Sequence, residues 1–295
     1  MKASIGIMAY NEEANIGNLL KELLKQKLGF VNEIVVVNDG STDKTAEIVK
    51  QFTKNSKIHL INLKKRGGKV NAINHFLKTT KSEVLILESA DTLPHKNAVR
   101  ELFNEFKDQK TGIAGAQIVP INKGKGFANF FGTFIYKLHH RIALEHPKFG
   151  ELIAFRNIIK KVPKSAVDEE CLAMLIKKED YKLVYCPAAI VYNKQPTSVK
   201  ELIIQRRRIH AGHLSLKKKG YKASTLNIRN ILKVILKEID VKKPHYVFFS
   251  IALEIYTRIL GFIDYKNKKD HYIWDVVKST KSLEELKISK YLNSK

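Results

Sequence analysis

Near-continuous apolar runs, each closed by a polar turn, recur along the first two thirds of the chain. They predict strands at 3–9, 33–37, 57–63, 83–87, 111–120, 151–156 and 182–192. Runs without alternation are typical of strands buried on both faces of a parallel sheet. Between them, segments such as 42–54 carry apolar residues at helical spacing. The pattern therefore predicts an α/β fold with a mainly parallel sheet flanked by helices.

The first two strands end in polar loops that carry carboxylates. The loops read YNEE at 10–13 and NDGSTD at 38–43. Open α/β sheets bind ligands at the carboxyl ends of their strands. Asp39 is therefore a candidate acceptor for a hydrogen bond from a base or a ribose. We expect Ser41 and Thr42 to cap the helix that follows.

These two loops resemble the start of the family 2 glycosyltransferases, which have the GT-A fold and use nucleotide sugars as donors. Further matches follow downstream in the same order. By this resemblance, Ala9, Tyr10, Glu12 and Asp39 line the nucleotide pocket. Taken singly, each loop is explained as an ordinary turn or a helix-capping loop, so the interpretation depends on the later matches.

A basic, glycine-bearing segment follows the third predicted strand. It reads KKRGGKVNAIN at 64–74 and opens a helix. Backbone N–H groups at a helix N-terminus bind phosphate, so Gly68 and Lys69 are candidates for the donor diphosphate. The part GKVNAIN also resembles the family's loop and helix that reaches the donor. Alone, a lysine-rich turn before a helix is usually only a solvated turn.

The fourth predicted strand ends in ESADTLP, where the family carries an Asp-x-Asp motif. Hard oxygen ligands there hold a divalent cation that bridges the two phosphates. Ser89 replaces the first aspartate and Asp91 keeps the second. The resemblance therefore assigns Asp91 as the ligand of Mg²⁺ or Mn²⁺, with Ser89 and Ala90 beside the donor and Glu88 as a helper. The structural alternative is that Asp91 caps the next helix.

Three acidic residues, Asp168, Glu169 and Glu170, open an amphipathic helix. Carboxylates suit the first turn of a helix because of its dipole, which is a sufficient structural explanation. The family, however, places its catalytic base in an acidic pair at this point. Inverting transfer needs a carboxylate that takes the proton from the attacking hydroxyl. By the resemblance, the register favours Glu169 over Asp168 as that base.

The segment QRRRI at 205–209 resembles the family's Q-x-x-R-W motif, with Ile209 in place of tryptophan. Gln205 and Arg208 lie three residues apart and so share one face of a helix. By the resemblance, Arg208 offsets charge on the departing nucleoside diphosphate. The missing tryptophan removes a stacking platform and argues against acceptor binding of the processive-synthase kind. A simple basic helix face would not explain the glutamine.

Two segments bear on membrane association. The aromatic face at 126–144 is typical of a core helix, with a helix in the lipid headgroups as the alternative. The segment 245–263 is apolar except for a stripe that contains Ser250, Glu254, Thr257, Arg258 and Gly261. Each charge costs about 2.5–3.5 kcal/mol near a bilayer centre, which argues against a free-standing span. We expect this stripe to pack on protein, with the glutamate and the arginine paired.

The remaining C-terminal sequence carries no motif of the family. It predicts a basic amphipathic helix at 227–239, and lysines flank the apolar segment at 242–243 and 266–269. Each basic residue contributes about 1 kcal/mol at an anionic leaflet. We therefore expect a GT-A domain at 1–225 and a helical membrane-associating segment at 226–295. A helical cap on a soluble enzyme is the alternative.

Composition limits the remaining possibilities. Fifty-three Lys and Arg against 29 Asp and Glu give a formal charge of +24, which favours anionic partners such as a membrane surface. No nucleic-acid-binding module accompanies this charge, so we expect no nucleic acid partner. The two cysteines fit a reducing compartment, and the chain enters its first strand directly, without a signal peptide. We expect an enzyme at the cytoplasmic face of the cell membrane.

The expected reaction is transfer of a sugar from a UDP- or GDP-sugar to a hydroxyl of a glycan or a lipid-linked acceptor. Three alternatives remain open. A nucleotidyltransferase on a related sheet would release pyrophosphate, which the acidic pair and the Q-x-x-R segment argue against. An inactive nucleotide- or lipid-binding scaffold is suggested by Ser89 in the metal motif. Nucleic-acid binding has only the net charge in its favour.

Overall fold

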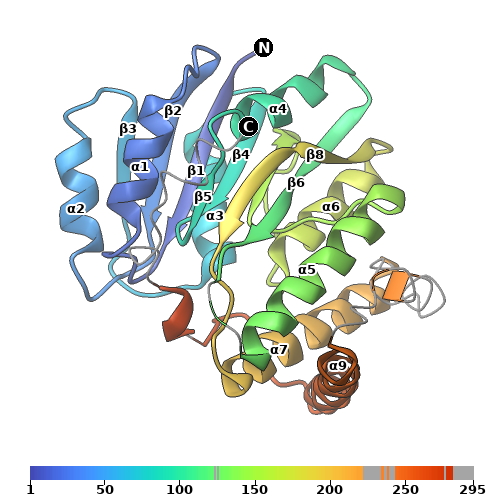
Figure 1. Cartoon of the computed structure of the whole chain (residues 1–295). Helices are drawn as coiled ribbons and strands as arrows, with labels where there is room; N and C mark the ends of the chain where they lie inside the picture. The colour runs from blue at the N-terminus through green and yellow to red at the C-terminus, as the bar shows by residue number, and fades with distance from the viewer. Residues whose placement is uncertain are drawn as a thin grey trace.

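The computed structural model describes residues 1–122, 124, 126–221, 234, 235, 238, 243–275 and 277–281 of the chain. Within these residues, eight strands form one sheet in the order β3-β2-β1-β4-β7-β6-β8-β5 (Figure 1). The strands are β1 (Ala3–Ala9), β2 (Val31–Asn38), β3 (Ile58–Asn62), β4 (Val84–Ser89), β5 (Thr92–Pro94), β6 (Thr111–Pro120), β7 (Leu152–Arg156) and β8 (Lys182–Asn193). All but β5 lie where the apolar runs predicted them.

The sheet is mixed. β3, β2, β1 and β4 run parallel to one another. β7 is antiparallel to both of its neighbours, β4 and β6, and β5 is antiparallel to β8. β6 and β8 are parallel. The parallel half brings the carboxyl ends of β1, β2 and β4 to one edge, where their polar loops meet.

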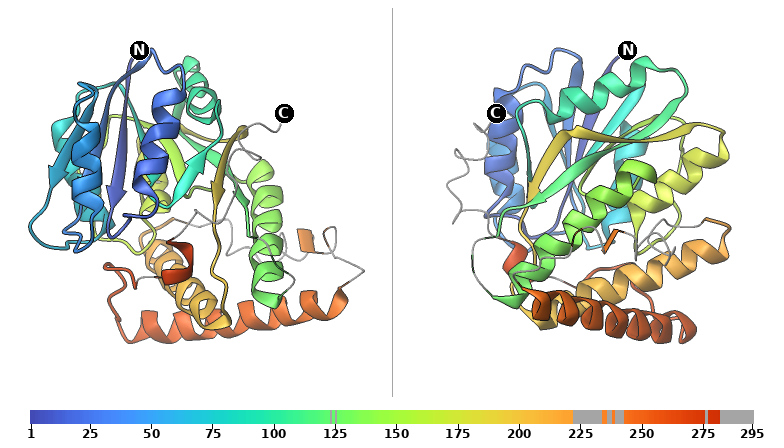
Figure 2. Two further views of the ribbon diagram at one scale, coloured as in Figure 1. Left: turned by 60° about the vertical axis from the view of Figure 1, so that its left-hand side comes forward. Right: turned by 45° about the vertical axis from the view of Figure 1, so that its right-hand side comes forward.

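Helices cover both faces of the sheet (Figures 1 and 2). They are α1 (Ile16–Lys25), α2 (Thr45–Phe52), α3 (Lys69–Thr79), α4 (Ala98–Asn104), α5 (Phe127–Glu145), α6 (Asp168–Lys178), α7 (Val199–Lys218) and α9 (Pro244–Lys266), with 3-10 turns at Glu105–Lys107 and Lys278–Thr280. Ile5 and Ile7 of β1 pack with α1, α2 and α4. Gly6 faces the opposite core, where a Cβ would lie 2.7 Å from the ring of Phe76 in α3, so this position requires glycine.

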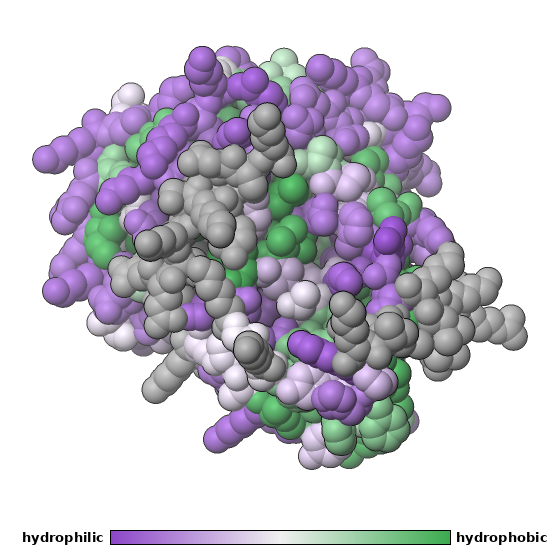
Figure 3. Space-filling model, in the orientation of Figure 1, coloured by the Kyte–Doolittle hydropathy of each residue, from purple (hydrophilic) through white to green (hydrophobic). Residues whose placement is uncertain are grey.

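α9 packs along α7 at one end of the molecule (Figure 2). The predicted polar stripe faces protein, because Ser250 and Thr257 are both 1% exposed. The predicted pair also forms, with Nε of Arg258 donating to Oε1 of Glu254 at 2.9 Å. Apolar side chains cover the lower edge of the molecule over α9 (Figure 3). The exposed apolar residues of α9 are Phe248, Phe249, Ile255, Tyr256, Ile259, Phe262 and Ile263.

The aromatic face of α5 belongs to the protein interior. Phe131 is 1% exposed and Phe134 is 4% exposed. The ring of Phe127 contacts the rings of Tyr246 and Phe249 in α9. These contacts favour the core interpretation of α5 over a helix in the lipid headgroups.

The basic helix predicted at 227–239, together with Lys242, lies outside the described residues except for three positions. Two of these, Val234 and Ile235, pack against the cluster of Phe134, Leu138 and Val247. The third, Glu238, accepts a hydrogen bond from Nε of Arg141 at 2.6 Å.

The predicted capping of α2 by Ser41 and Thr42 is wrong. α2 begins at Thr45, whose backbone N–H donates to Oδ1 of Asp43 at 3.0 Å. Oγ of Ser41 instead accepts from the backbone N–H of Asn11 at 2.9 Å, and the N–H of Thr42 donates to Oδ1 of Asn11 at 2.9 Å. These residues therefore join the loop after β1 to the loop after β2.

Candidate active site

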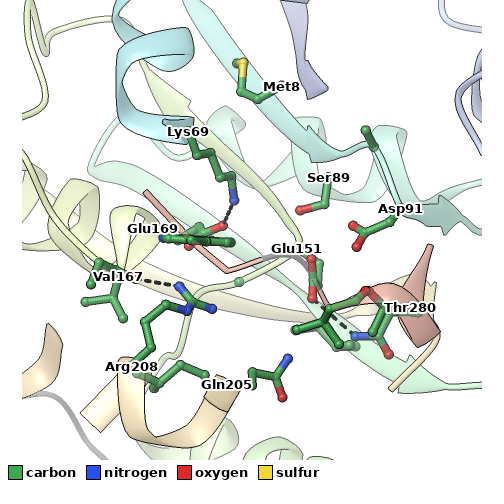
Figure 4. A pocket seen from close by; sticks show the side chains of 18 of the residues that line it. Met8, Lys69, Ser89, Asp91, Glu151, Val167, Glu169, Gln205, Arg208 and Thr280 are labelled. Atoms are coloured by element: carbon green, nitrogen blue, oxygen red, sulfur yellow. Dashed lines mark hydrogen bonds and ion pairs between the residues drawn. The ribbon is translucent and has the colours of Figure 1, made fainter. Parts of the chain in front are cut away.

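A pocket of about 290 Å³ lies where the loops after β1, β2 and β4 face α6 and α7 (Figure 4). Such a volume is at the lower end of ordinary ligand sites. Of the predicted site residues, Asp168 and the helper Glu88 are missing from its lining. The predicted residues that do line it are Ala9, Tyr10, Glu12, Asp39, Gly68, Lys69, Ser89, Ala90, Asp91, Glu169, Gln205 and Arg208.

Asp39 holds the glycine loop in place. Its carboxylate accepts hydrogen bonds from the backbone N–H groups of Gly67 at 2.8 Å and Gly68 at 2.7 Å. The two loops come this close because Gly40 has a φ of +69°, and a Cβ there would meet the backbone of Arg66 at 2.6 Å. Burial raises the pKa of Asp39, although the two N–H donors act against this shift. In this conformation both carboxylate oxygens of Asp39, which were expected to contact the nucleotide, accept hydrogen bonds from the glycine loop instead.

Residues 270–275 and 277–281 of the C-terminal sequence reach back to the predicted nucleotide residues. Nζ of Lys281 pairs with Oε1 of Glu12 and also donates to the carbonyl of Tyr10 at 3.4 Å. The guanidinium of Arg66 lies 3.9 Å from the centroid of the Tyr10 ring, and it donates to the carbonyl of Trp274 at 2.6 Å. The C-terminal sequence carries no motif of the family, yet this part of it contacts the predicted nucleotide residues.

Carboxylates gather around Asp91, below Ser89 in Figure 4. Glu151 faces the same space, and its backbone carbonyl accepts from the N–H of Ser89 at 2.9 Å. Burial, followed by the charge of Glu151, raises the pKa of Asp91 to about 7. Burial also raises the pKa of Glu88 well above its usual value, and its Oε2 is buried without a hydrogen-bond partner among the described residues.

These oxygens fit a divalent cation that the donor helps to bind. No group of three or more His, Cys, Asp or Glu side chains among the described residues could hold a metal ion by itself. Magnesium is often bound by one or two carboxylates together with substrate phosphates and water, which Asp91 and Glu151 can satisfy. The alternative that Asp91 only caps a helix is wrong, because β5 intervenes and α4 begins at Ala98.

Lys69 links the glycine loop to the acidic pair. Its Nζ lies 3.1 Å from Oδ2 of Asp168 and also pairs with Oε1 of Glu169. Burial raises the pKa of Asp168 to about 6. Burial alone would raise the pKa of Glu169 too, but the charge and hydrogen bond of Lys69 outweigh it and lower that pKa. Asp168 is fully buried, whereas Glu169 lines the pocket, so only Glu169 faces a ligand there.

Arg208 is held from two sides. It donates to the carbonyl of Ala166 at 2.8 Å, and its guanidinium lies 3.6 Å from the centroid of the Trp274 ring. Burial lowers the pKa of Arg208 to about 10. Gln205 lies one turn earlier on α7, in the same pocket (Figure 4). An aromatic ring thus covers Arg208, but it is that of Trp274 in the C-terminal segment and not a tryptophan at position 209.

Sequence reasoning missed Glu151, Trp274 and Lys281 as pocket residues. Glu151 opens a predicted strand, and its acidic side chain next to a glycine was the available signal. Trp274 is the only tryptophan of the chain, which is a weak signal of its own. No local pattern connects Lys281 to Glu12, which lies at the other end of the sequence.

Comparison with known sequences matches residues 4–178 to the family described as "Glycosyl transferase family 2". A poly-beta-1,6-N-acetyl-D-glucosamine synthase from a strain of Staphylococcus epidermidis is 33% identical over 221 residues, which are 70% of this chain and 53% of that protein. Another from Staphylococcus epidermidis is 25% identical over 260 residues, 83% of this chain and 62% of that protein. The chain thus spans little more than half the length of these curated relatives.

Two solved structures of similar fold bind nucleotides. The mannosyltransferase PcManGT from Pyrobaculum calidifontis, in complex with GDP-Man and Mn²⁺, has a TM-score of 0.67 at 19% identity and covers 91% of this chain and 88% of its own. Glucosyl-3-phosphoglycerate synthase from Mycobacterium tuberculosis, with Mn²⁺, UDP and phosphoglyceric acid, has a TM-score of 0.53 at 17% identity, covering 71% and 76%. At these identities the likeness shows the fold.

Proposed function

The chain belongs to glycosyl transferase family 2 and is a glycosyltransferase with the GT-A fold, and on that premise we propose that it moves a sugar, with inversion, from a UDP- or GDP-sugar to a hydroxyl of a glycan or a lipid-linked acceptor. One observation carries the proposal. Asp39, Lys69, Asp91, Glu169 and Arg208 come from five separate segments and line one pocket. The nucleotide sugars named with similar structures, GDP-Man and UDP-Glc, support this donor class.

The donor occupies the side of the pocket formed by the loops after β1, β2 and β4. Tyr10 and Glu12 contact the nucleotide, and Asp39 fixes the glycine loop through the N–H groups of Gly67 and Gly68. The start of α3 at Lys69 faces the diphosphate. Asp91 and Glu151 would hold Mg²⁺ or Mn²⁺ together with the donor phosphates. The cation, when bound, neutralises charge that develops on the departing diphosphate.

The acceptor hydroxyl is activated by Glu169. The carboxylate of Glu169 takes the hydroxyl proton as the oxygen attacks the anomeric carbon, and Asp168 stays buried behind it. Arg208 stabilises the charge that accumulates on the leaving nucleoside diphosphate. Lys69 pairs with the acidic residues while no donor is bound, and the diphosphate then offers it a competing anion. Donor binding thereby frees the base.

A panel of UDP- and GDP-sugars, each with Mg²⁺ or Mn²⁺, tests this function through release of nucleoside diphosphate. We expect metal-dependent release from the preferred donor, lost in Asp91→Asn. Asp180→Asn is the matched control, because Asp180 is exposed with a φ of +59°, a conformation that asparagine also favours. Release of pyrophosphate would identify a nucleotidyltransferase. No release from any donor would reject the enzyme function and leave a binding scaffold.

We also propose that this glycosyltransferase works at the cytoplasmic face of the cell membrane, with residues 1–225 as the catalytic domain. Within residues 226–295, α9 associates with lipid, while Trp274 and Lys281 line the pocket. α9 is long and apolar enough to cross a bilayer by length and composition. Its charged stripe packs on α7, so we place it in the membrane surface, with its exposed apolar face in the headgroup region. The net charge of +24 favours anionic lipid.

Flotation with phosphatidylglycerol and phosphatidylcholine vesicles tests the membrane proposal. We expect the protein to float with the anionic vesicles, and Phe248→Glu to weaken this binding, because Phe248 is 67% exposed on α9. Leu24→Glu is the control, since Leu24 is 39% exposed on α1, away from α9. Equal flotation of both variants would show that α9 does not contact lipid.

A further inference from the structure

Lys148 is a buried lysine that the proposed reaction does not use. It lies three residues before Glu151, is 5% exposed, and lines the pocket. Its side chain makes no hydrogen bond or ion pair to any residue that the structure describes. Lysine is almost never fully buried unless it is paired, because burying a charge without a partner is costly. An anionic ligand bound in the pocket would supply the partner that the Lys148 ammonium group lacks.

The acidic groups near Lys148 are already bound to other residues. Glu170 accepts a hydrogen bond from the hydroxyl of Tyr221 at 2.8 Å, and no ion pair within 4.0 Å joins it to Lys148 in the described residues. Glu254 accepts two hydrogen bonds from Arg206, at 2.9 and 2.8 Å. Burial lowers the pKa of Lys148 to about 8, with Glu170 acting against this shift.

Two histidines line the same end of the pocket. His139 comes from α5 and His213 from α7, and both belong to the lining. Burial, followed by the charge of Lys148 and then that of Arg206, lowers the pKa of both histidines well below its usual value. They are therefore neutral near pH 7, so neither adds a charge at this end, and the ring of His139 can donate one N–H. Apart from Glu170, whose carboxylate accepts a hydrogen bond from Tyr221, the groups named at this end are cations and N–H donors, which together suit an oxyanion.

We propose that Lys148, with His139 and His213, forms a subsite for an anionic group of the acceptor, either a phosphate or a carboxylate. Lys148 lies near Glu170, the residue after Glu169, and so on the acceptor side of the pocket. The inference rests on the proposed function, since it takes Glu169 as the base. The acceptor is then a hydroxylated compound whose hydroxyl reaches Glu169 while a phosphate or carboxylate elsewhere in the same molecule binds Lys148.

Calorimetric titration of the full chain with inorganic phosphate, and separately with acetate, tests the subsite. Saturating nucleoside diphosphate and Mn²⁺ are present so that the donor site does not take up the probe. We expect one of the two anions to bind wild-type protein and to bind Lys148→Met at least tenfold more weakly. Lys148→Arg keeps the charge and retains binding. Lys54→Met, at an exposed lysine of the surface, leaves binding unchanged.

Thermal unfolding separates loss of the subsite from loss of the fold. Lys148→Met removes a buried charge, so its melting temperature should not fall. Preference for phosphate would identify a phosphorylated acceptor, and preference for acetate a carboxylated one. Binding of neither anion, or binding that survives Lys148→Met, would overturn the subsite. The proposed function fails on a different result: no release of nucleoside diphosphate from any donor in the nucleotide-sugar panel.

Discussion

The ion-pair group that joins α9 to α7 makes a quantitative prediction. Glu254 of α9 accepts from Arg206 of α7 at 2.9 and 2.8 Å and from Arg258 at 2.9 Å. Burial alone would raise the pKa of Glu254, but the two arginines outweigh it and lower the pKa from 4.5 to about 2. A shift of roughly 2.5 units corresponds to about 3 kcal/mol of folding free energy.

The sign of the pH dependence follows from the direction of this shift. Because the pKa of Glu254 is lower in the folded protein than in the unfolded chain, the stabilisation is fully present above about pH 4.5. It is lost as the pH falls from 4.5 toward 2. Glu254→Gln removes it and leaves two arginines without their partner, so we expect a loss of about 3 kcal/mol at pH 7.

Urea unfolding of wild type and Glu254→Gln between pH 7 and pH 3 measures this energy. The difference in unfolding free energy should be near 3 kcal/mol at pH 7 and should shrink below pH 4.5. Glu145→Gln is the control, because Glu145 is exposed at the end of α5, and its effect should stay within about 0.5 kcal/mol. A difference below 1 kcal/mol at pH 7, or one that does not change with pH, would refute the reasoning.

Three further predictions concern the pocket. Glu169→Gln should lower the rate of sugar transfer by about 10²- to 10⁴-fold, while nucleotide binding measured by calorimetry persists. Full transfer by both Glu169→Gln and Asp168→Asn would contradict the assignment of the base. Trp274→Ala removes a cation–π contact of about 0.5–2 kcal/mol, so kcat should fall roughly 2- to 30-fold, with Trp274→Phe as the partial rescue. Lys281→Met removes the ion pair to Glu12, so the Kd for nucleoside diphosphate should fall up to about fivefold. A higher Kd would show that Lys281 assists binding.

The strands, and the part of the pocket formed by the loops after β1, β2 and β4, could be predicted because their signals are local. An apolar run closed by a polar loop specifies both a buried strand and the edge at which its loop emerges. Tyr10, Asp39 and Asp91 each follow such a run directly, so the parallel sheet alone brings them together. Lys69 at the start of a helix and Glu169 in a first turn carry equally local signals.

The C-terminal contributions could not be predicted, because they depend on how distant segments pack. Trp274 reaches Arg208 only because α9 lies along α7 and the chain then turns back to the pocket. Lys281 meets Glu12 across 269 positions of sequence. The failed capping assignment has a similar origin, since Ser41 bonds to Asn11 of another loop instead of to its own helix. Competition between loops is invisible in a single window of sequence.

Only eight positions separate Lys266, where α9 ends, from Trp274. Eight residues span at most about 29 Å when fully extended, so this tether is short. The helix proposed to rest on lipid and the ring that covers Arg208 therefore cannot move independently over long distances. If α9 lies on a membrane, the position of Trp274 over Arg208 depends on how that surface holds the helix.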